Sequence, residues 1–81
     1  MSKKNVTIYV SEDCHQCGDL ITQLDEWNIS YHVKNVTKNR RHLEELQDIG
    51  VFGTPATVVD EEIILGFPRG ILQRVFNIYD G

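Results

Sequence analysis

The two cysteines of the chain, Cys14 and Cys17, are separated by two residues. Thiol–disulfide exchange needs one accessible thiolate that attacks a disulfide sulfur and a second thiol that displaces whatever the first has captured. A step of three residues on a helix brings two side chains to the same face. We therefore predict that Cys14 attacks and Cys17 resolves, a chemistry that needs no bound cofactor and no metal.

The residues around the pair predict how a thiolate would be stabilised. The β-branched and aromatic run 6–10 is typical of a strand buried on both faces. Asp13 is expected to cap the following helix. Cys14 would then lie at a helix N-terminus, where free backbone N–H groups and the helix dipole favour the thiolate over the thiol. Apolar residues recur after it at helical spacing, namely Cys17, Leu20, Ile21, Leu24 and Trp27.

Asp13, His15 and Gln16 are candidate residues for tuning the first thiol. A protonated His15 beside Cys14 would favour its thiolate, whereas Glu12 and Asp13 would oppose it. The ordinary pKa of histidine supports a second interpretation, in which His15 is simply exposed and neutral at pH 7. The sequence leaves both interpretations open.

The remaining pattern predicts a single α/β domain over residues 1–81, with the element order βαβαββα. A strand over 29–33 should run parallel to the first, because a strand–helix–strand crossover is right-handed and returns to the same sheet. The other predicted elements are a helix over 40–49 closed by Gly50, a hairpin over 56–59 and 63–65, and a last helix starting at Pro68. The aromatic residues Tyr9, Trp27, Phe52, Phe76 and Tyr79 are expected in the core or at its edge.

The length, composition and charge of the chain restrict the partners and the location that we expect. The chain has 81 residues, 41% of them hydrophobic, and a net charge of −4, which argues for one modest core and against a nucleic-acid partner. No apolar run approaches the roughly 20 residues of a membrane span. The five strand-like residues that follow residues 1–5 are also too few for the apolar region of a signal peptide. We expect a cytoplasmic monomer, in which a Cys-x-x-Cys pair is catalytic or metal-binding rather than a permanent crosslink.

Thr54-Pro55, directly before the predicted third strand, is the second chemical signal. Proline cannot donate a backbone hydrogen bond, so it is confined to edges and turns of sheets, and a cis bond is the minority form. If the bond is cis beside the cysteines, the N–H and C=O of Thr54 could pair with an extended substrate chain.

Taken together, the cysteine motif, Thr54-Pro55 and Gly66-Phe67 after the fourth strand resemble the glutaredoxin family of the thioredoxin fold. The segment Asp13-Cys14-His15-Gln16-Cys17 is similar to the Asp-Cys-x-Gln-Cys of NrdH-type redoxins. The resemblance implies a four-stranded mixed sheet flanked by three helices, with Pro55 in cis beside the thiols. It also implies protein disulfides as substrates, ribonucleotide reductase as one acceptor and thioredoxin reductase as electron donor.

Because the sequence departs from the family pattern at some positions, other functions also have to be considered. Glutaredoxins hold the glutathione amine with an acidic residue where this chain has Gly66-Phe67-Pro68-Arg69, and Ser11 replaces a basic residue that such redoxins often carry. A glutathione-recycled glutaredoxin is the alternative, followed by a zinc-binding or redox-inactive interaction module. Phe67 is expected either to pack in the core or to form a docking surface.

Overall fold

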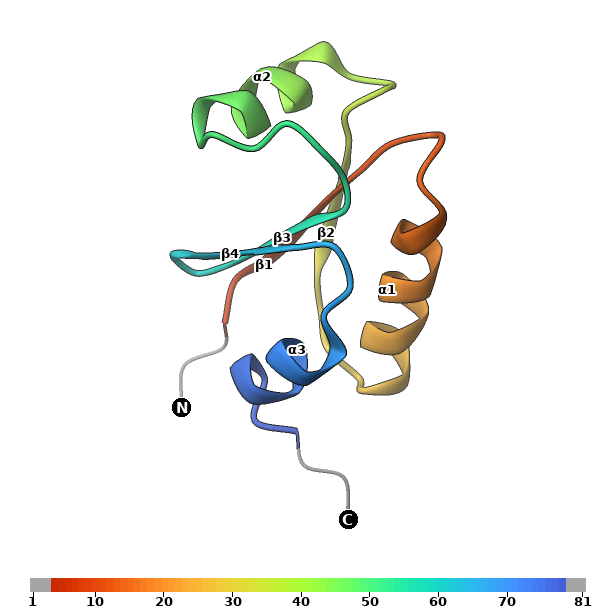
Figure 1. Cartoon of the computed structure of the whole chain (residues 1–81), viewed down its shortest axis with the longest axis vertical. Helices are drawn as coiled ribbons and strands as arrows, with labels where there is room; N and C mark the ends of the chain where they lie inside the picture. The colour runs from red at the N-terminus through yellow and green to blue at the C-terminus, as the bar shows by residue number, and fades with distance from the viewer. Residues whose placement is uncertain (1–3, 79–81) are drawn as a thin grey trace.

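The computed structural model describes residues 4–78. Its elements confirm the predicted order βαβαββα (Figure 1). They are β1 (Val6–Val10), α1 (His15–Glu26), β2 (His32–Asn35), α2 (Arg40–Asp48), β3 (Ala56–Val59), β4 (Glu62–Leu65) and α3 (Arg69–Val75). Within the same range, no helix is long and apolar enough to cross a membrane.

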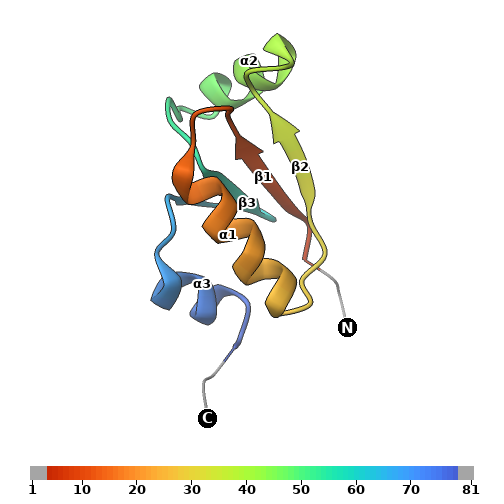
Figure 2. The ribbon, with the colours of Figure 1, turned by 90° about the vertical axis from the view of Figure 1, so that its right-hand side faces the viewer.

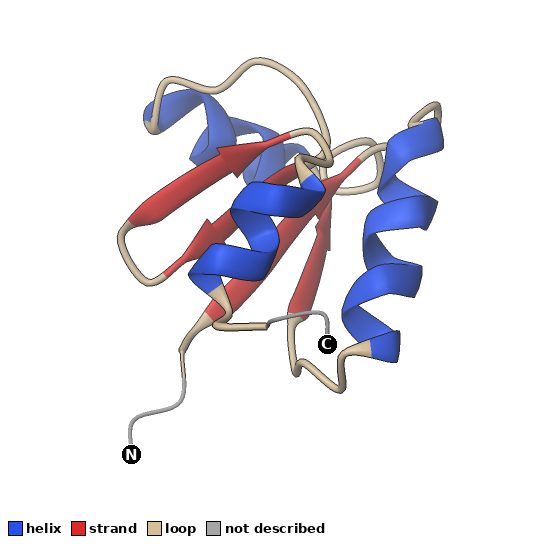
Figure 3. Ribbon diagram, turned by 60° about the horizontal axis from the view of Figure 1, so that its bottom comes forward, coloured by secondary structure: helices blue, strands red, loops and turns tan. Residues whose placement is uncertain are grey.

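The four strands form one mixed sheet in the order β2-β1-β3-β4. β1 pairs with β2 in parallel and with β3 antiparallel, and β3 pairs with β4 antiparallel. Figures 1 and 3 show α2 on one face of the sheet and α1 with α3 on the other. This is the thioredoxin-like glutaredoxin fold, with β1 at the centre and its C-terminal end leading directly to the two cysteines.

Two apolar clusters hold the helices against the sheet. The larger lies under α1 and α3, where Ile8, Leu20, Leu24 and Leu72 are completely buried. The smaller lies under α2 and consists of Tyr9, Leu46, Val51 and Ala56. Alternate residues of β1 thus serve opposite faces, which is why nearly the whole strand is buried.

A polar contact supports the α2 side of the sheet. The Lys34 ammonium lies 2.7 Å from a carboxylate oxygen of Glu45, which also accepts a hydrogen bond from the Tyr9 hydroxyl. The hydrogen bond from Lys34 lowers the pKa of Glu45 from its ordinary value, while burial raises the pKa of Tyr9. Lys34 also lies 5.6 Å from the centre of the Tyr9 ring. The contact links β1, β2 and α2 near the end of the sheet at which β1 leads to the two cysteines.

The predicted start of β2 is wrong by three residues. The expected strand began at residue 29, but the N–H of Ile29 instead donates to the C=O of Leu24 and closes α1. Asn28, with φ of 58°, makes the left-handed turn required by this helix ending. β2 therefore begins at His32, and Ile29 packs against the larger apolar cluster.

Two further expectations need correction. α3 begins at Arg69, and Pro68 is its extended N-cap rather than its first helical residue. Phe52, expected in the core, is 79% exposed. Val51 closes α2 through its N–H and is buried, so the next side chain points outward. Trp27 and Phe76 pack at the core edge as predicted, whereas Tyr79 lies outside the described residues.

Candidate active site

Cys14 and Cys17 form a disulfide, with their Cα atoms 5.4 Å apart. The loop after β1 carries Cys14 to the start of α1, and Cys17 lies one turn further along the helix. Cys17 is buried, with 5% of its surface exposed, whereas Cys14 is only partly buried against the larger cluster. The pair is therefore asymmetric, with one sulfur near the surface and the other beneath it.

Cys14 itself, and not Asp13, caps α1. The backbone at Cys14 is extended, with φ of −111° and ψ of 105°, and its sulfur accepts a hydrogen bond from the N–H of Cys17 at 3.2 Å. Asp13 was expected in this role, but the helix starts one residue later and Asp13 is exposed. The N–H of Cys17, in the first helical turn, therefore points at the Cys14 sulfur, where it would favour a negative charge.

The charges near Cys14 are exposed to solvent. His15 and Gln16 lie on the surface of the first turn, together with Glu12 and Asp13. Glu12 faces the ammonium group of Lys38 at 3.9 Å, with both side chains more than half exposed. Such pairs contribute little energy, but the positive charge partly offsets that of Glu12. The N–H of Glu12 also donates to the Thr37 hydroxyl and ties this loop to the one before α2.

The Thr54–Pro55 peptide bond is cis, as the family resemblance implied. The Thr54 hydroxyl lies 2.6 Å from the Ser11 hydroxyl, so a hydrogen bond joins the loop before β3 to the loop before Cys14. Among residues 4–78, neither the N–H nor the C=O of Thr54 has a protein partner. Thr54 is thus held by its side chain while its backbone groups stay available.

Gly66 and Phe67 close the site from the side of β4. The N–H of Gly66 donates to the C=O of Pro55 at 2.9 Å. Gly66 has φ of 73°, and a Cβ at this position would lie 3.5 Å from Oε1 of Gln16. Phe67 is partly buried against the larger apolar cluster, which favours the packing role among the two that the sequence allowed.

The structure therefore brings together three segments that are far apart in the sequence. Figure 2 shows the start of α1, the segment before β3 and the segment leading from β4 to α3 on the left-hand side of the view, between α2 and α3. The sequence predicted these segments, but it did not identify Ser11 as a contact of Thr54. A serine in a loop carries no pattern of its own, and its partner is 43 residues away.

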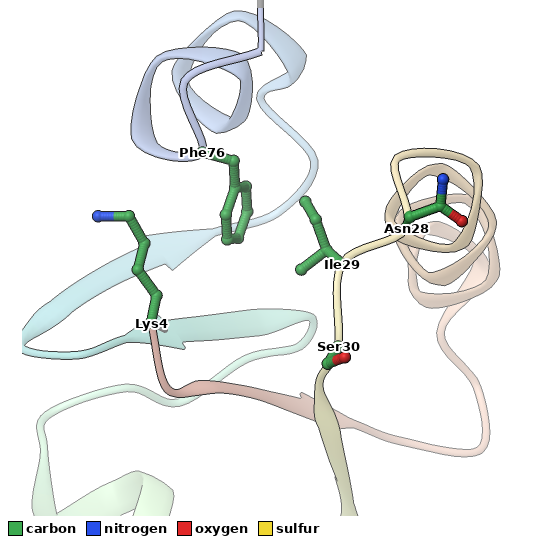
Figure 4. Close-up of a pocket in the computed structure, with 5 residues that line it drawn as sticks. All are labelled: Lys4, Asn28, Ile29, Ser30 and Phe76. Carbon is green, nitrogen blue, oxygen red and sulfur yellow. The ribbon is translucent and has the colours of Figure 1, made fainter. Parts of the chain in front are cut away.

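Neither a metal-binding cluster nor a cavity elsewhere in the described residues offers an alternative to this site. Among the described residues, no group of three or more His, Cys, Asp and Glu is arranged to hold a metal ion. A cavity of about 270 Å³ lies at the far end of α1 from Cys14, where Phe76 and Ile29 point toward one another (Figure 4). Its lining contains no thiol and none of the candidate site residues that the sequence predicted.

Comparisons with known proteins agree with the geometry. Residues 6–64 match the glutaredoxin family. The thioredoxin-like protein BC3987 has the same fold with a TM-score of 0.83 and 28% identity, over 88% of this chain and 99% of that one. The glutaredoxin-like protein NrdH-redoxin from Escherichia coli, which has a thioredoxin-like activity profile, matches with a TM-score of 0.79 and 22% identity. The match covers 88% of this chain and 93% of that one. No curated protein matches the sequence at a significant level.

The Ser11–Thr54 hydrogen bond gives the first prediction. If it holds the Thr54 backbone in place, Ser11→Ala and Thr54→Val should each lower kcat/KM for insulin-disulfide reduction, mainly through KM. The double variant should be no worse than either single one, which corresponds to a coupling of about 0.5–1.5 kcal/mol. Thr54→Ser keeps the hydroxyl and should retain activity. Losses that simply add would show that the two hydroxyl groups act independently.

Proposed function

The chain belongs to the glutaredoxin family, and on that premise we propose that it reduces protein disulfides through Cys14 and Cys17. The observation that carries the proposal is the hydrogen bond from the N–H of Cys17 to the partly exposed sulfur of Cys14. In the reduced protein the same donor would stabilise a Cys14 thiolate, and the thiolate is the nucleophilic form.

The proposed reaction has two displacement steps. The Cys14 thiolate attacks one sulfur of the substrate disulfide, which forms a mixed disulfide and releases the other substrate sulfur as a thiolate. Cys17, deprotonated, then attacks the Cys14 sulfur and releases the second substrate sulfur. The substrate gains two electrons and two protons in total, and the protein ends with the Cys14–Cys17 disulfide that the structure contains.

Thr54 is the residue proposed to orient the substrate. Its free N–H and C=O match the donor and acceptor of one residue of an extended chain, the pairing used when a peptide adds to a sheet edge. Ser11 fixes Thr54 relative to the loop that carries Cys14. Pro55 and Gly66 line the same space as Thr54, whereas Phe67 follows Gly66 and packs against the larger apolar cluster. Asp13, His15 and Gln16 form the exposed rim around the cysteines.

Thioredoxin reductase is the electron donor that the site favours over glutathione. Residues 66–69 contain no carboxylate to receive the glutathione ammonium group. A missing contact of this charged type weakens binding by about 1.5–3 kcal/mol, or roughly tenfold or more. The resemblance of Asp13-Cys14-His15-Gln16-Cys17 to the motif of NrdH-type redoxins implies the same donor and makes ribonucleotide reductase one acceptor to test.

The reaction order predicts that Cys17→Ser traps the substrate. Without its resolving thiol, the protein should accumulate a mixed disulfide through Cys14, because Cys14 is only partly buried whereas Cys17 is buried. Mass spectrometry after incubation with an oxidised protein should find this adduct, and Cys14→Ser should form none. An adduct through Cys17 in the Cys14→Ser protein would reverse the assigned roles.

The choice of electron donor predicts different rates with two reducing systems. NADPH oxidation with insulin as acceptor should be at least about tenfold faster with thioredoxin reductase than with glutathione and glutathione reductase. Arg69→Asp, which introduces a carboxylate where glutaredoxins carry their acidic residue, should increase the rate with glutathione and so reduce the difference between the two rates. A faster wild-type reaction with glutathione would make the chain a glutathione-recycled glutaredoxin.

A further inference from the structure

Phe52 is the most exposed large apolar side chain in the described part of the protein, with 79% of its surface accessible. It lies two residues before Thr54 and borders a groove of about 230 Å³. Leu65, which is 59% exposed, borders the same groove from β4. We call this hollow the Phe52–Leu65 groove; the other residues that line it are Gly50, Val51, Gly53, Thr54, Pro55 and Gly66.

The groove is continuous with the candidate active site. Thr54 lines it and is bonded to Ser11 in the cysteine loop, and Gly66 lines it and faces Gln16 between the two cysteines. A chain that pairs with the backbone of Thr54 would therefore lie at this groove, which Phe52 and Leu65 also line. Successive side chains of an extended chain point alternately to opposite sides, so a residue next to the paired one is available to enter the groove.

The chemistry of the lining restricts what can enter. None of its eight residues carries a charge. Glutathione carries two carboxylates and an ammonium group, which would lose water there without gaining a partner. A large aliphatic or aromatic side chain would instead bury the exposed surfaces of Phe52 and Leu65 and gain the corresponding hydrophobic free energy.

We propose that the Phe52–Leu65 groove binds a large apolar side chain next to the cysteine of a polypeptide disulfide, and so selects the substrates of this protein. The inference rests on the proposed function and names its substrate class. Phe52 and Leu65 are specificity-determining residues, which act on binding and not on the exchange of electrons. The apolar surface continues along β4 to Ile63, which is 42% exposed on the same face as Leu65.

Two synthetic peptides test the groove directly. Each contains one disulfide, and they differ only in the residue beside one cysteine, which is Leu in the first and Ser in the second. The wild-type protein should reduce the Leu peptide with a kcat/KM about tenfold higher, mainly through KM. Phe52→Ala and Leu65→Ala should each reduce this preference to about threefold or less.

Matched controls come from exposed apolar residues outside the groove. Val33 is 46% exposed and Ile71 is 43% exposed, and neither lines it. Val33→Ala and Ile71→Ala should therefore keep the wild-type preference. Phe52→Ala removes a side chain that is mostly in solvent, so the fold should tolerate it, and circular dichroism checks this.

A small substrate separates the two proposals. All variants are also assayed with 2-hydroxyethyl disulfide, which has no side chain to fill the groove. An unchanged preference for the Leu peptide in Phe52→Ala and Leu65→Ala would overturn the groove and leave the proposed function in place. A wild-type protein that reduces neither the peptides nor 2-hydroxyethyl disulfide would instead contradict the proposed function itself.

Discussion

The hydrogen bond from the N–H of Cys17 to the sulfur of Cys14 is the interaction on which the rest of the site depends. It exists because α1 starts immediately after Cys14, so that a cysteine occupies the capping position normally taken by an oxygen-bearing side chain. A sulfur in that position meets unpaired N–H groups and the positive end of the helix dipole. The nearby acidic residues oppose a negative charge there, but they are exposed to water, which weakens their effect.

The fold supplies the rest of the site by bringing distant segments to the end of β1. The buried central strand fixes where the cysteine loop begins, and the Ser11–Thr54 and Gly66–Pro55 hydrogen bonds join that loop to the segments before β3 and after β4. Redox chemistry needs only the two sulfurs. In the proposed function, recognition of a polypeptide uses the backbone of Thr54 and the apolar surfaces beside it, which come from a different part of the chain.

The element order and the cysteine pair could be predicted because each depends on local pattern. Val6–Val10, the apolar spacing of α1 and Gly50 at the end of α2 each carry a signal within a few residues. The errors arose where backbone closure decided the outcome. Ile29 resembles a strand residue but closes α1, and Phe52 resembles a core aromatic but follows Val51, which takes the buried position. The Ser11–Thr54 contact could not be predicted, because neither residue type indicates a partner 43 positions away.

The N-terminus of α1 should stabilise a negative charge on Cys14. Titration of the reduced Cys17→Ser variant by the ultraviolet absorbance of the thiolate tests it most directly, because Cys14 is then the sole thiol and the backbone N–H at position 17 remains. In the folded protein the pKa of Cys14 should lie below that of an ordinary cysteine, and in guanidinium chloride it should return to the ordinary value. A folded-state pKa at or above the ordinary value would show that the helix N-terminus does not stabilise the thiolate.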